Sequence, residues 1–243
     1  MYVLMTMKIG ILCAGDSEVA PFIPMIEECI ITEKAMLRFY EGKIEGRDVV
    51  TLFTGVCKVN AAIATQILID TYGCNIIINS GTAGGMDDSL NIFDTVISNE
   101  VAYYDVDEEI LTEFHPWLDS IYFKADESLL FLAKKSISNI NSKYNIVFGR
   151  MITGETFIED ERRELINSKY APLSVDMETA SVAHVCYVNK IPFIAVRTIT
   201  DTSSHSGIEE FEKNCDKASQ ISANLVKCIL RELYAEEKGH GKF

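Results

Sequence analysis

Three acidic residues follow segments that are predicted to be strands, and their positions suggest a site. Glu18 comes shortly after the apolar run Lys8–Cys13, Glu178 stands where a strand meets a helix, and Asp201 follows a second apolar strand. In an open α/β sheet, ligands bind at the carboxyl ends of strands. We therefore expect a proton donor, a base and a ligand holder among these carboxyl groups. The alternative interpretation is structural: Glu178 caps a helix, Asp201 begins a loop, and Glu18 is an ordinary acid in a first helical turn.

Two other segments also leave predicted strands. Asn79–Gly85 is rich in glycine, which lets a backbone approach a ligand closely, but it has neither the lysine nor the spacing of a P-loop or a dinucleotide fingerprint. Thr153–Ile158 contains Phe157, whose ring suits either the core or a stacking platform for a ligand.

Strands and helices alternate along the chain, which predicts an α/β fold. Residues 35–54 alternate around 41–43 and 45–48, which predicts antiparallel strands with tight turns, and hence a mixed sheet. A helix capped by Asp16 or Ser17 is expected to run to about Ile31. Further strands are expected at 8–13, 75–79, 93–99, 145–151 and 191–200, and helices at 56–71, 127–139, 159–167 and 208–234. The last helix carries an apolar stripe that predicts packing on the sheet: Phe211, Cys215, Ala218, Ile221, Leu225, Ile229 and Leu233.

Length and composition fit one domain. The chain has 243 residues, of which 48% are apolar, and contains no repeat, linker or low-complexity segment. We therefore expect a single domain over residues 1–243, with an N-terminal extension at 1–6 and a frayed tail at 235–243. Met7 precedes the first strand directly, so either Met1 or Met7 can be the natural start.

Charge and cysteine usage exclude several classes of protein. A net charge of −14 disfavours a nucleic-acid partner but not an uncharged nucleoside. The seven cysteines show no CxxC pair and the four histidines no metal-ligand spacing, which predicts buried free thiols in a reducing cytoplasm and no bound metal. No apolar run reaches the ~20 residues of a membrane span, and no signal peptide is recognisable.

Four strand-exit segments in this order carry a resemblance to a known family. They are Ala14–Val19, Asn79–Gly85, Thr156–Ile158, and Val175–Glu178 followed by Arg197–Asp201. The chain resembles the purine nucleoside phosphorylase and nucleosidase superfamily and, within it, bacterial 5′-methylthioadenosine/S-adenosylhomocysteine nucleosidases, from Met7 to roughly Leu233. The resemblance implies a three-layer αβα sandwich around a mixed, barrel-like sheet. It also implies a cytoplasmic homodimer, without cofactor, whose partner closes part of the alkylthio pocket.

The resemblance also implies roles for individual residues. Asp201 matches the acid that protonates adenine N7, Glu18 the base that activates water, and Glu178 the carboxylate that binds the ribose hydroxyls. Phe157 matches the ring stacked on adenine, Met177 the residue packed on the sugar, and Ile208 a family aromatic near the ribose and the 5′ tail. Backbone groups of Ile158 match those that read the purine edge, and the remaining pocket-lining or orienting positions are Thr82, Ala83, Gly84, Val56, Arg197 and Thr200.

The implied reaction is hydrolysis of an N-glycosidic bond, which releases adenine in methionine salvage and nucleoside catabolism. Positive charge builds on the sugar and adenine leaves only when protonated, so Asp201 must keep a proton near neutral pH. Asp16 and Glu18 would repel phosphate, and Asn79 stands where hexameric phosphorylases carry an arginine, which favours water as the nucleophile over phosphate. The alternatives are a phosphate-dependent phosphorylase, a nucleosidase for another modified purine nucleoside such as a futalosine-type compound, and a nucleoside-binding or storage protein.

Overall fold

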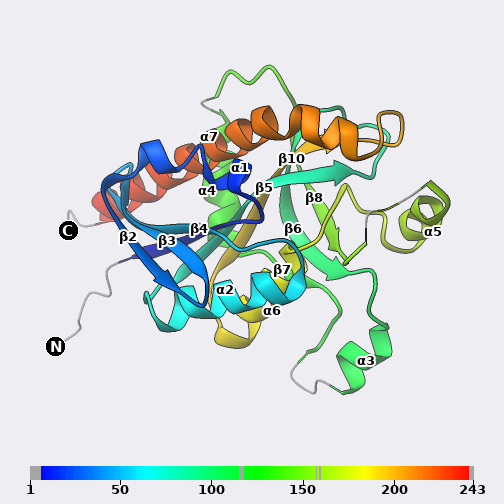
Figure 1. The fold of residues 1–243 in the computed structure, drawn as a ribbon, viewed down its shortest axis with the longest axis horizontal. Helices are drawn as coiled ribbons and strands as arrows, with labels where there is room; N and C mark the ends of the chain where they lie inside the picture. The colour runs from blue at the N-terminus through cyan, green and yellow to red at the C-terminus, as the bar shows by residue number, and fades with distance from the viewer. Residues whose placement is uncertain (1–6, 115–117, 139, 157, 159, 241–243) are drawn as a thin grey trace.

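A mixed β-sheet lies at the centre of the computed structural model, with helices on both of its faces (Figure 1). The structure describes residues 7–114, 118–138, 140–156, 158 and 160–240. The strands are β1 (Lys8–Cys13), β2 (Glu27–Lys34), β3 (Leu37–Ile44), β4 (Arg47–Phe53), β5 (Ile76–Gly85), β6 (Thr95–Tyr103), β7 (Phe123–Lys124), β8 (Ile146–Thr153), β9 (Ser174–Asp176) and β10 (Phe193–Asp201). The helices are α1 (Asp16–Val19), α2 (Lys58–Asp70), α3 (Glu108–Glu113), α4 (Glu127–Ser138), α5 (Asp160–Tyr170), α6 (Thr179–Asn189) and α7 (Ile208–His240), with a 3₁₀ turn at Ile23–Met25.

Strand pairing closes part of the sheet into a barrel. The order is β10-β6-β8-β9-β5-β1-β4-β3-β2, and β5 also pairs with β10, so that β10, β6, β8, β9 and β5 form a ring. β1 and β10 both run parallel to β5, and their carboxyl ends therefore meet at one edge. The predicted α/β fold with a mixed, barrel-like sheet is confirmed.

The two faces of the sheet bury separate clusters of apolar side chains. Ile9 and Ile11 of β1 pack in one cluster with Ile229 of α7, whereas Leu12 packs in the other with Leu68 of α2. Side chains alternate between the faces of a strand, so β1 contributes to both clusters. The predicted packing of the last helix on the sheet is also found, and the chain forms three layers.

The helix predicted to run to Ile31 is wrong. α1 is one turn long and begins after Gly15, with no side-chain cap from Asp16 or Ser17. Pro21 and Pro24 lack a backbone N–H and disfavour a longer helix. The β-branched residues that follow pair in β2 with β3.

The turn expected at 41–43 is also absent, because β3 continues through Gly42. A Cβ on Gly42 would lie 2.4 Å from the carbonyl oxygen of Glu27, so this glycine serves close strand contact and not a turn. The turn expected at 45–48 is real: Glu45 and Gly46 connect β3 to β4, and both have positive φ.

Several elements extend beyond the predicted bounds. β5 continues through the glycine-rich segment to Gly85, because β9 and β10 pair with it there. β6 reaches Tyr103, β8 reaches Thr153 and α7 reaches His240, whereas a frayed tail was expected from residue 235. The short helix α3 was not among the predicted helices.

The seven cysteines are free, as predicted, but they are not all buried: Cys29 is exposed on β2. Among the described residues, no helix has the length and apolar character needed to cross a membrane.

Candidate functional site

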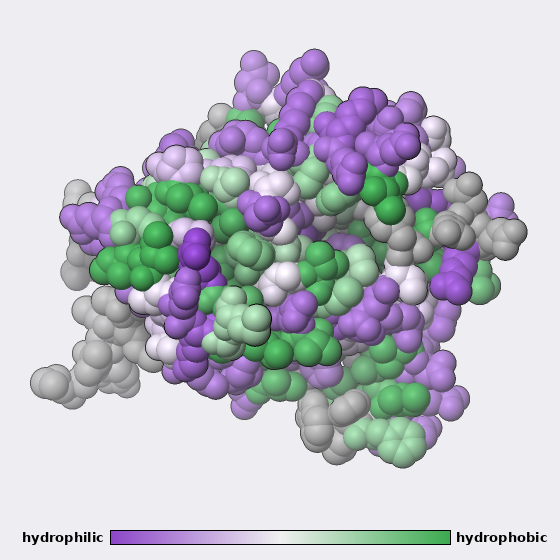
Figure 2. Space-filling model, viewed as in Figure 1, coloured by the Kyte–Doolittle hydropathy of each residue, from purple (hydrophilic) through white to green (hydrophobic). Residues whose placement is uncertain are grey.

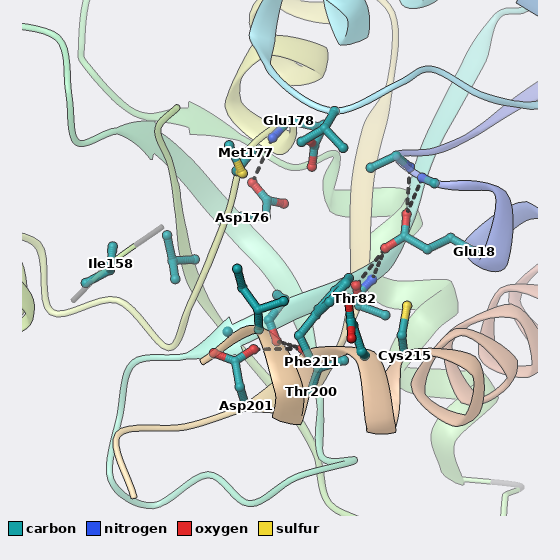
Figure 3. Close-up of a pocket in the computed structure, with 18 of the residues that line it drawn as sticks. Glu18, Thr82, Ile158, Asp176, Met177, Glu178, Thr200, Asp201, Phe211 and Cys215 are labelled. Atoms are coloured by element: carbon teal, nitrogen blue, oxygen red, sulfur yellow. Dashed lines mark hydrogen bonds between the residues drawn. The ribbon is translucent and has the colours of Figure 1, made fainter. Parts of the chain in front are cut away.

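A cavity of about 360 Å³ opens where β1, β5, β9 and β10 end (Figure 3). The structure brings the predicted Glu18, Glu178 and Asp201 to its wall from three distant parts of the chain. The other predicted residues that line it are Val56, Thr82, Ala83, Gly84, Ile158, Met177, Thr200 and Ile208. Arg197 is completely buried behind the wall, and Phe157 lies outside the described residues.

Glu18 is held by hydrogen bonds to both carboxylate oxygens. Oε2 accepts from the backbone N–H of Ala14 at 2.6 Å and of Gly15 at 3.2 Å. Oε1 accepts from the backbone N–H and the hydroxyl of Thr82, both at 2.7 Å. A Cβ on Gly81 would come within 2.4 Å of this carboxylate, so glycine is needed here for close approach. The short helix α1 and the glycine-rich end of β5 therefore fix one side chain together.

Arg197 connects three carboxylates behind the cavity wall. Its Nε lies 3.0 Å from Asp176 Oδ2, its Nη1 3.5 Å from Glu18 Oε1, and its Nη2 3.4 Å from Glu178 Oε2. The second oxygen of Glu178 accepts from the backbone N–H of Cys57 at 2.9 Å. All three carboxylates are buried, so a single guanidinium carries much of their compensation.

Burial also raises the pKa of Glu178, to about 7. The positive charge of Arg197 opposes this rise in pKa, whereas the negative charges of Asp176 and Glu18 add to it. Glu178 occupies the position before α6, yet its side chain makes no capping hydrogen bond. The structural interpretation therefore holds for the position of Glu178, which is the N-cap residue of α6, but not for its side chain.

Asp201 lies at the other side of the cavity, at the end of β10. The hydroxyl of Thr200 donates to its Oδ1 at 2.8 Å. Burial raises the pKa of Asp201, while the Thr200 hydroxyl and the positive charge of Arg163 oppose that rise. A Cβ on Gly84 would lie 3.2 Å from Oδ2, so Gly84 leaves this oxygen room to face the cavity. The result is a carboxyl group that retains its proton to a higher pH than an exposed aspartate.

Several lining residues were missed from the sequence. Phe211 and Cys215 had been assigned to the core stripe of the last helix, but both line the cavity. Phe211 stands one helical turn after the exposed Ile208 and supplies an aromatic ring at that part of the wall, a spacing that the sequence displays. Asp176 and Arg163 were also missed, although Asp176 directly precedes Met177 and Glu178. The other lining residues that were not predicted are Ala14, Gly15, Ser17, Thr156, Val175 and Glu212.

Comparisons with known proteins give a consistent result. The family model described as the phosphorylase superfamily matches residues 8–231. A 5′-methylthioadenosine/S-adenosylhomocysteine nucleosidase from a Geobacillus species is 37% identical over 93% of this chain and 99% of its own length.

Solved structures of a nucleosidase of this name and of a futalosine hydrolase share the fold. The nucleosidase of Colwellia psychrerythraea, solved with adenine, has a TM-score of 0.86 and 34% identity, covering 94% of this chain and 96% of its own. The futalosine hydrolase of Helicobacter pylori has a TM-score of 0.83 and 26% identity, covering 94% of this chain and 99% of its own. The chain therefore belongs to the phosphorylase superfamily and, within it, to the family of 5′-methylthioadenosine/S-adenosylhomocysteine nucleosidases.

Proposed function

We infer that this chain is an N-glycosyl hydrolase that splits 5′-methylthioadenosine and S-adenosylhomocysteine into adenine and the 5′-thio-substituted ribose. The observation that carries this conclusion is the meeting of Glu18, Glu178 and Asp201 around one cavity in a member of this family. A protein that only bound or stored a nucleoside would not need all three acids.

Asp201 is the proposed general acid. As the C1′–N9 bond breaks, its electron pair moves into the purine, and a proton from Asp201 to N7 makes adenine a neutral leaving group. The raised pKa of Asp201 supports this role, because the carboxyl group must still hold its proton near neutral pH.

Glu18 is the proposed general base. A water oxygen attacks C1′ while one of its protons passes to the Glu18 carboxylate. The hydroxyl of Thr82 now donates to Oε1, but it is a rotor and can turn to share that oxygen with an entering water. Thr82 and Glu18 would then hold the water between them.

The remaining residues would bind the substrate. We propose that Glu178 accepts hydrogen bonds from the ribose hydroxyls and that Met177 packs on the sugar. Phe157 would stack on adenine, whose edge the backbone of Ile158 would read. Ala83, Gly84, Val56, Thr200 and Ile208 would line the pocket, with Arg197 orienting the carboxylates from behind.

The charge around the nucleophile position argues for water over phosphate. Arg197 is surrounded by three carboxylates, so phosphate at this position would face net negative charge. Asn79, where an arginine would indicate a phosphorylase, is buried and contacts Thr179 Oγ1 at 2.7 Å.

The resemblance to a futalosine hydrolase favours one alternative, a nucleosidase for a different modified purine nucleoside. Both reactions need an acid for the base and an activated water, so the identity of the leaving base and the 5′ group separates them. The cavity's chemistry is common to both.

A chromatographic assay of the released base tests the proposal. We expect adenine from methylthioadenosine and S-adenosylhomocysteine in buffer without phosphate, at a rate that added phosphate leaves unchanged. Strict dependence on phosphate would make the chain a phosphorylase. Turnover of futalosine in place of the two adenine nucleosides would make it a futalosine hydrolase.

We further propose that the protein acts as a cytoplasmic homodimer in methionine salvage and nucleoside catabolism.

Apolar side chains gather over α2 on the face seen in Figure 2. Val59 and Ile63 of α2 and Tyr187 and Val188 of α6 are exposed, and Val56 beside them lines the cavity. We refer to these five residues as the α2–α6 patch. Apolar patches of this kind mark protein interfaces, and here a second copy would lie next to the cavity.

A further inference from the structure

Asp176 uses both of its carboxylate oxygens, on four neighbouring residues. Oδ1 accepts from the Thr153 hydroxyl at 2.6 Å and from the backbone N–H groups of Glu178 at 3.2 Å and Thr179 at 3.1 Å. Oδ2 accepts from the Thr179 hydroxyl and lies 3.0 Å from Arg197 Nε. Four hydrogen-bond donors and the ion pair with Arg197 occupy about the four positions that a carboxylate offers, so Asp176 has little capacity left for a substrate.

The guanidinium of Arg197 is planar, so fixing Nε fixes the directions of both terminal nitrogens. Nε lies 3.0 Å from Asp176 Oδ2 and donates to Thr179 Oγ1 at 3.3 Å. Nη1 then faces Thr82 O at 3.2 Å and Glu18 Oε1 at 3.5 Å, and Nη2 faces Glu178 Oε2 at 3.4 Å. The contacts to the carboxylates of Glu18 and Glu178 are long, whereas the contact to Asp176 is short. Asp176 is therefore the stronger anchor of the arginine.

We propose that Asp176 is a positioning residue: it anchors Arg197 between Glu18 and Glu178, and through that arginine it sets the placement of both carboxylates and the charge of Glu178. This inference rests on the proposed roles of Glu18 and Glu178 in hydrolysis. Asp176 itself does not react. The same carboxylate shapes the turn from β9 into α6, so the loop that carries Met177 and Glu178 and the arginine behind it are fixed by one side chain.

The substitution Asp176→Asn separates these two tasks. Asparagine has one carbonyl oxygen, which can still accept from Thr153 and from the two backbone N–H groups. Its NH₂ then lies against Arg197 Nε, which keeps the hydrogen bond to Thr179 Oγ1 but loses the negative charge 3.0 Å away. The opposite orientation would place the NH₂ against those three donors. The variant therefore keeps the turn and loses the anchor of the arginine.

The titration of Glu178 in the free protein gives the first test. The charged groups that face it are Arg197 from β10, Asp176 from β9 and Glu18 from α1, with the Cys57 N–H from the start of α2. Removing the negative charge of Asp176 by itself lowers the pKa of Glu178, but Arg197 acts on Glu178 more strongly than Asp176 does. We therefore expect the loss of the arginine's anchor to outweigh the lost charge and to raise the pKa of Glu178 further. Carboxyl ¹³C NMR of protein labelled at glutamate measures this without substrate, and Glu178→Gln assigns the signal.

Three results are distinguishable in Asp176→Asn. A rise in the pKa of Glu178 supports the proposal. A fall would mean that Asp176 acts only as a nearby negative charge, and no change would mean a purely structural role; either result overturns the proposal. Because this measurement needs no turnover, it stands even if the proposed reaction is wrong.

Kinetics give a second test. We expect kcat/KM of Asp176→Asn to fall roughly 10²-fold, the size of effect that a small misplacement of catalytic groups produces. In the pH profile of kcat/KM, we expect the decline on the acid side to move to higher pH. Asp94→Asn is the matched control, because Asp94 is also buried and accepts from the N–H groups of Asn91 and Asn145, outside the cavity. Its acid limb should stay at the wild-type pH.

If Asp176→Asn does not fold, the variant Arg197→Lys tests the same action through the arginine. Lysine keeps the positive charge but cannot bridge three carboxylates in fixed directions. The pKa of Glu178 should rise in this variant too, and adding Asp176→Asn should lower kcat/KM little further. An unchanged pKa, or fully additive losses, would contradict action through the arginine.

Discussion

At the scale of single residues, two of the buried carboxyl groups in the site, Glu178 and Asp201, have different surroundings. Glu178 faces an arginine and two other acids, whereas Asp201 faces a hydroxyl and the more distant charge of Arg163. Burial raises the pKa of both, but only Glu178 has a cation within ion-pair distance. Environments of this kind let one carboxyl group serve as an acid while another binds as an anion.

For Asp201→Asn we expect a normal fold and a loss of kcat of about 10²–10⁴-fold, the usual contribution of a general acid. In the wild type, activity should fall as pH rises through the raised pKa of Asp201, because the ionised group has no proton to give. The residual activity of the variant should lack this alkaline limb. Thermal unfolding and calorimetry of adenine binding check the fold, and a fully active variant would remove Asp201 from the mechanism.

For Glu178→Gln we expect a pH-dependent gain in stability. The folded-state pKa of about 7 lies above the ordinary 4.5, so the stabilising contribution of the protonated carboxyl is present below pH 4.5 and is lost as pH rises through 7. Glutamine resembles the protonated form. Its free energy of unfolding relative to the wild type should therefore grow between pH 5 and pH 8, by on the order of 3 kcal/mol. Equal differences at both values in urea unfolding would contradict the raised pKa.

The residues that could be predicted from the sequence are those whose type and place were both informative. Glu18, Glu178 and Asp201 are acids at strand ends, and the structure gathers them. Asp176 was not singled out, because its importance comes from a contact with Arg197, which lies 21 positions later and becomes visible only when β9 and β10 are packed. Phe211 was missed because its spacing fits a core stripe as well as a cavity wall.

At the scale of elements, the periodic strands and helices were predictable and the loop before β2 was not. Lys8–Cys13 is an apolar run and the last helix carries an apolar stripe, and both elements are found. Residues 27–34 are exposed along the whole strand, so they lack the alternation that marks a half-buried strand. The part up to about Ile31 was mistaken for the end of a helix. β-Pairing with a neighbour, which no local pattern records, decides such segments.

Gly81→Ala tests how α1 and β5 cooperate. The new Cβ would come within 2.4 Å of Glu18, so the carboxylate must leave its four donors. We expect kcat to fall roughly 10²-fold, as misplacement of a reacting group does. Gly73→Ala is the matched control: Gly73 also has an unusual φ, of 69°, but its Cβ would meet nothing within 4 Å. That control should lose stability alone, and equal loss of kcat in both variants would contradict the steric explanation.

At the scale of the whole molecule, barrel closure explains why distant segments meet at one cavity. β5 pairs with both β1 and β10, so Glu18 after β1 and Asp201 at the end of β10 lie on either side of Thr82–Gly84. The sequence patterns indicated a mixed sheet, but the closure of five strands followed only from the resemblance to a family. Strand order depends on contacts between segments more than 100 residues apart, such as β5 with β10.

The α2–α6 patch gives the prediction at this scale. If a second copy covers this patch, sedimentation should give a molecular mass of twice the 27.2 kDa of one chain. Ile63→Glu places a charge in the patch and should shift the protein to monomer, because an unpaired charge is costly in an apolar interface. Ile31→Glu is the matched control, since Ile31 is 56% exposed and Ile63 46%, but Ile31 lies on β2, away from the patch. Sedimentation velocity distinguishes the two variants.

Val56 lines the cavity beside the patch, so the monomeric variant should also show a raised KM. A fully dimeric Ile63→Glu would place the interface elsewhere.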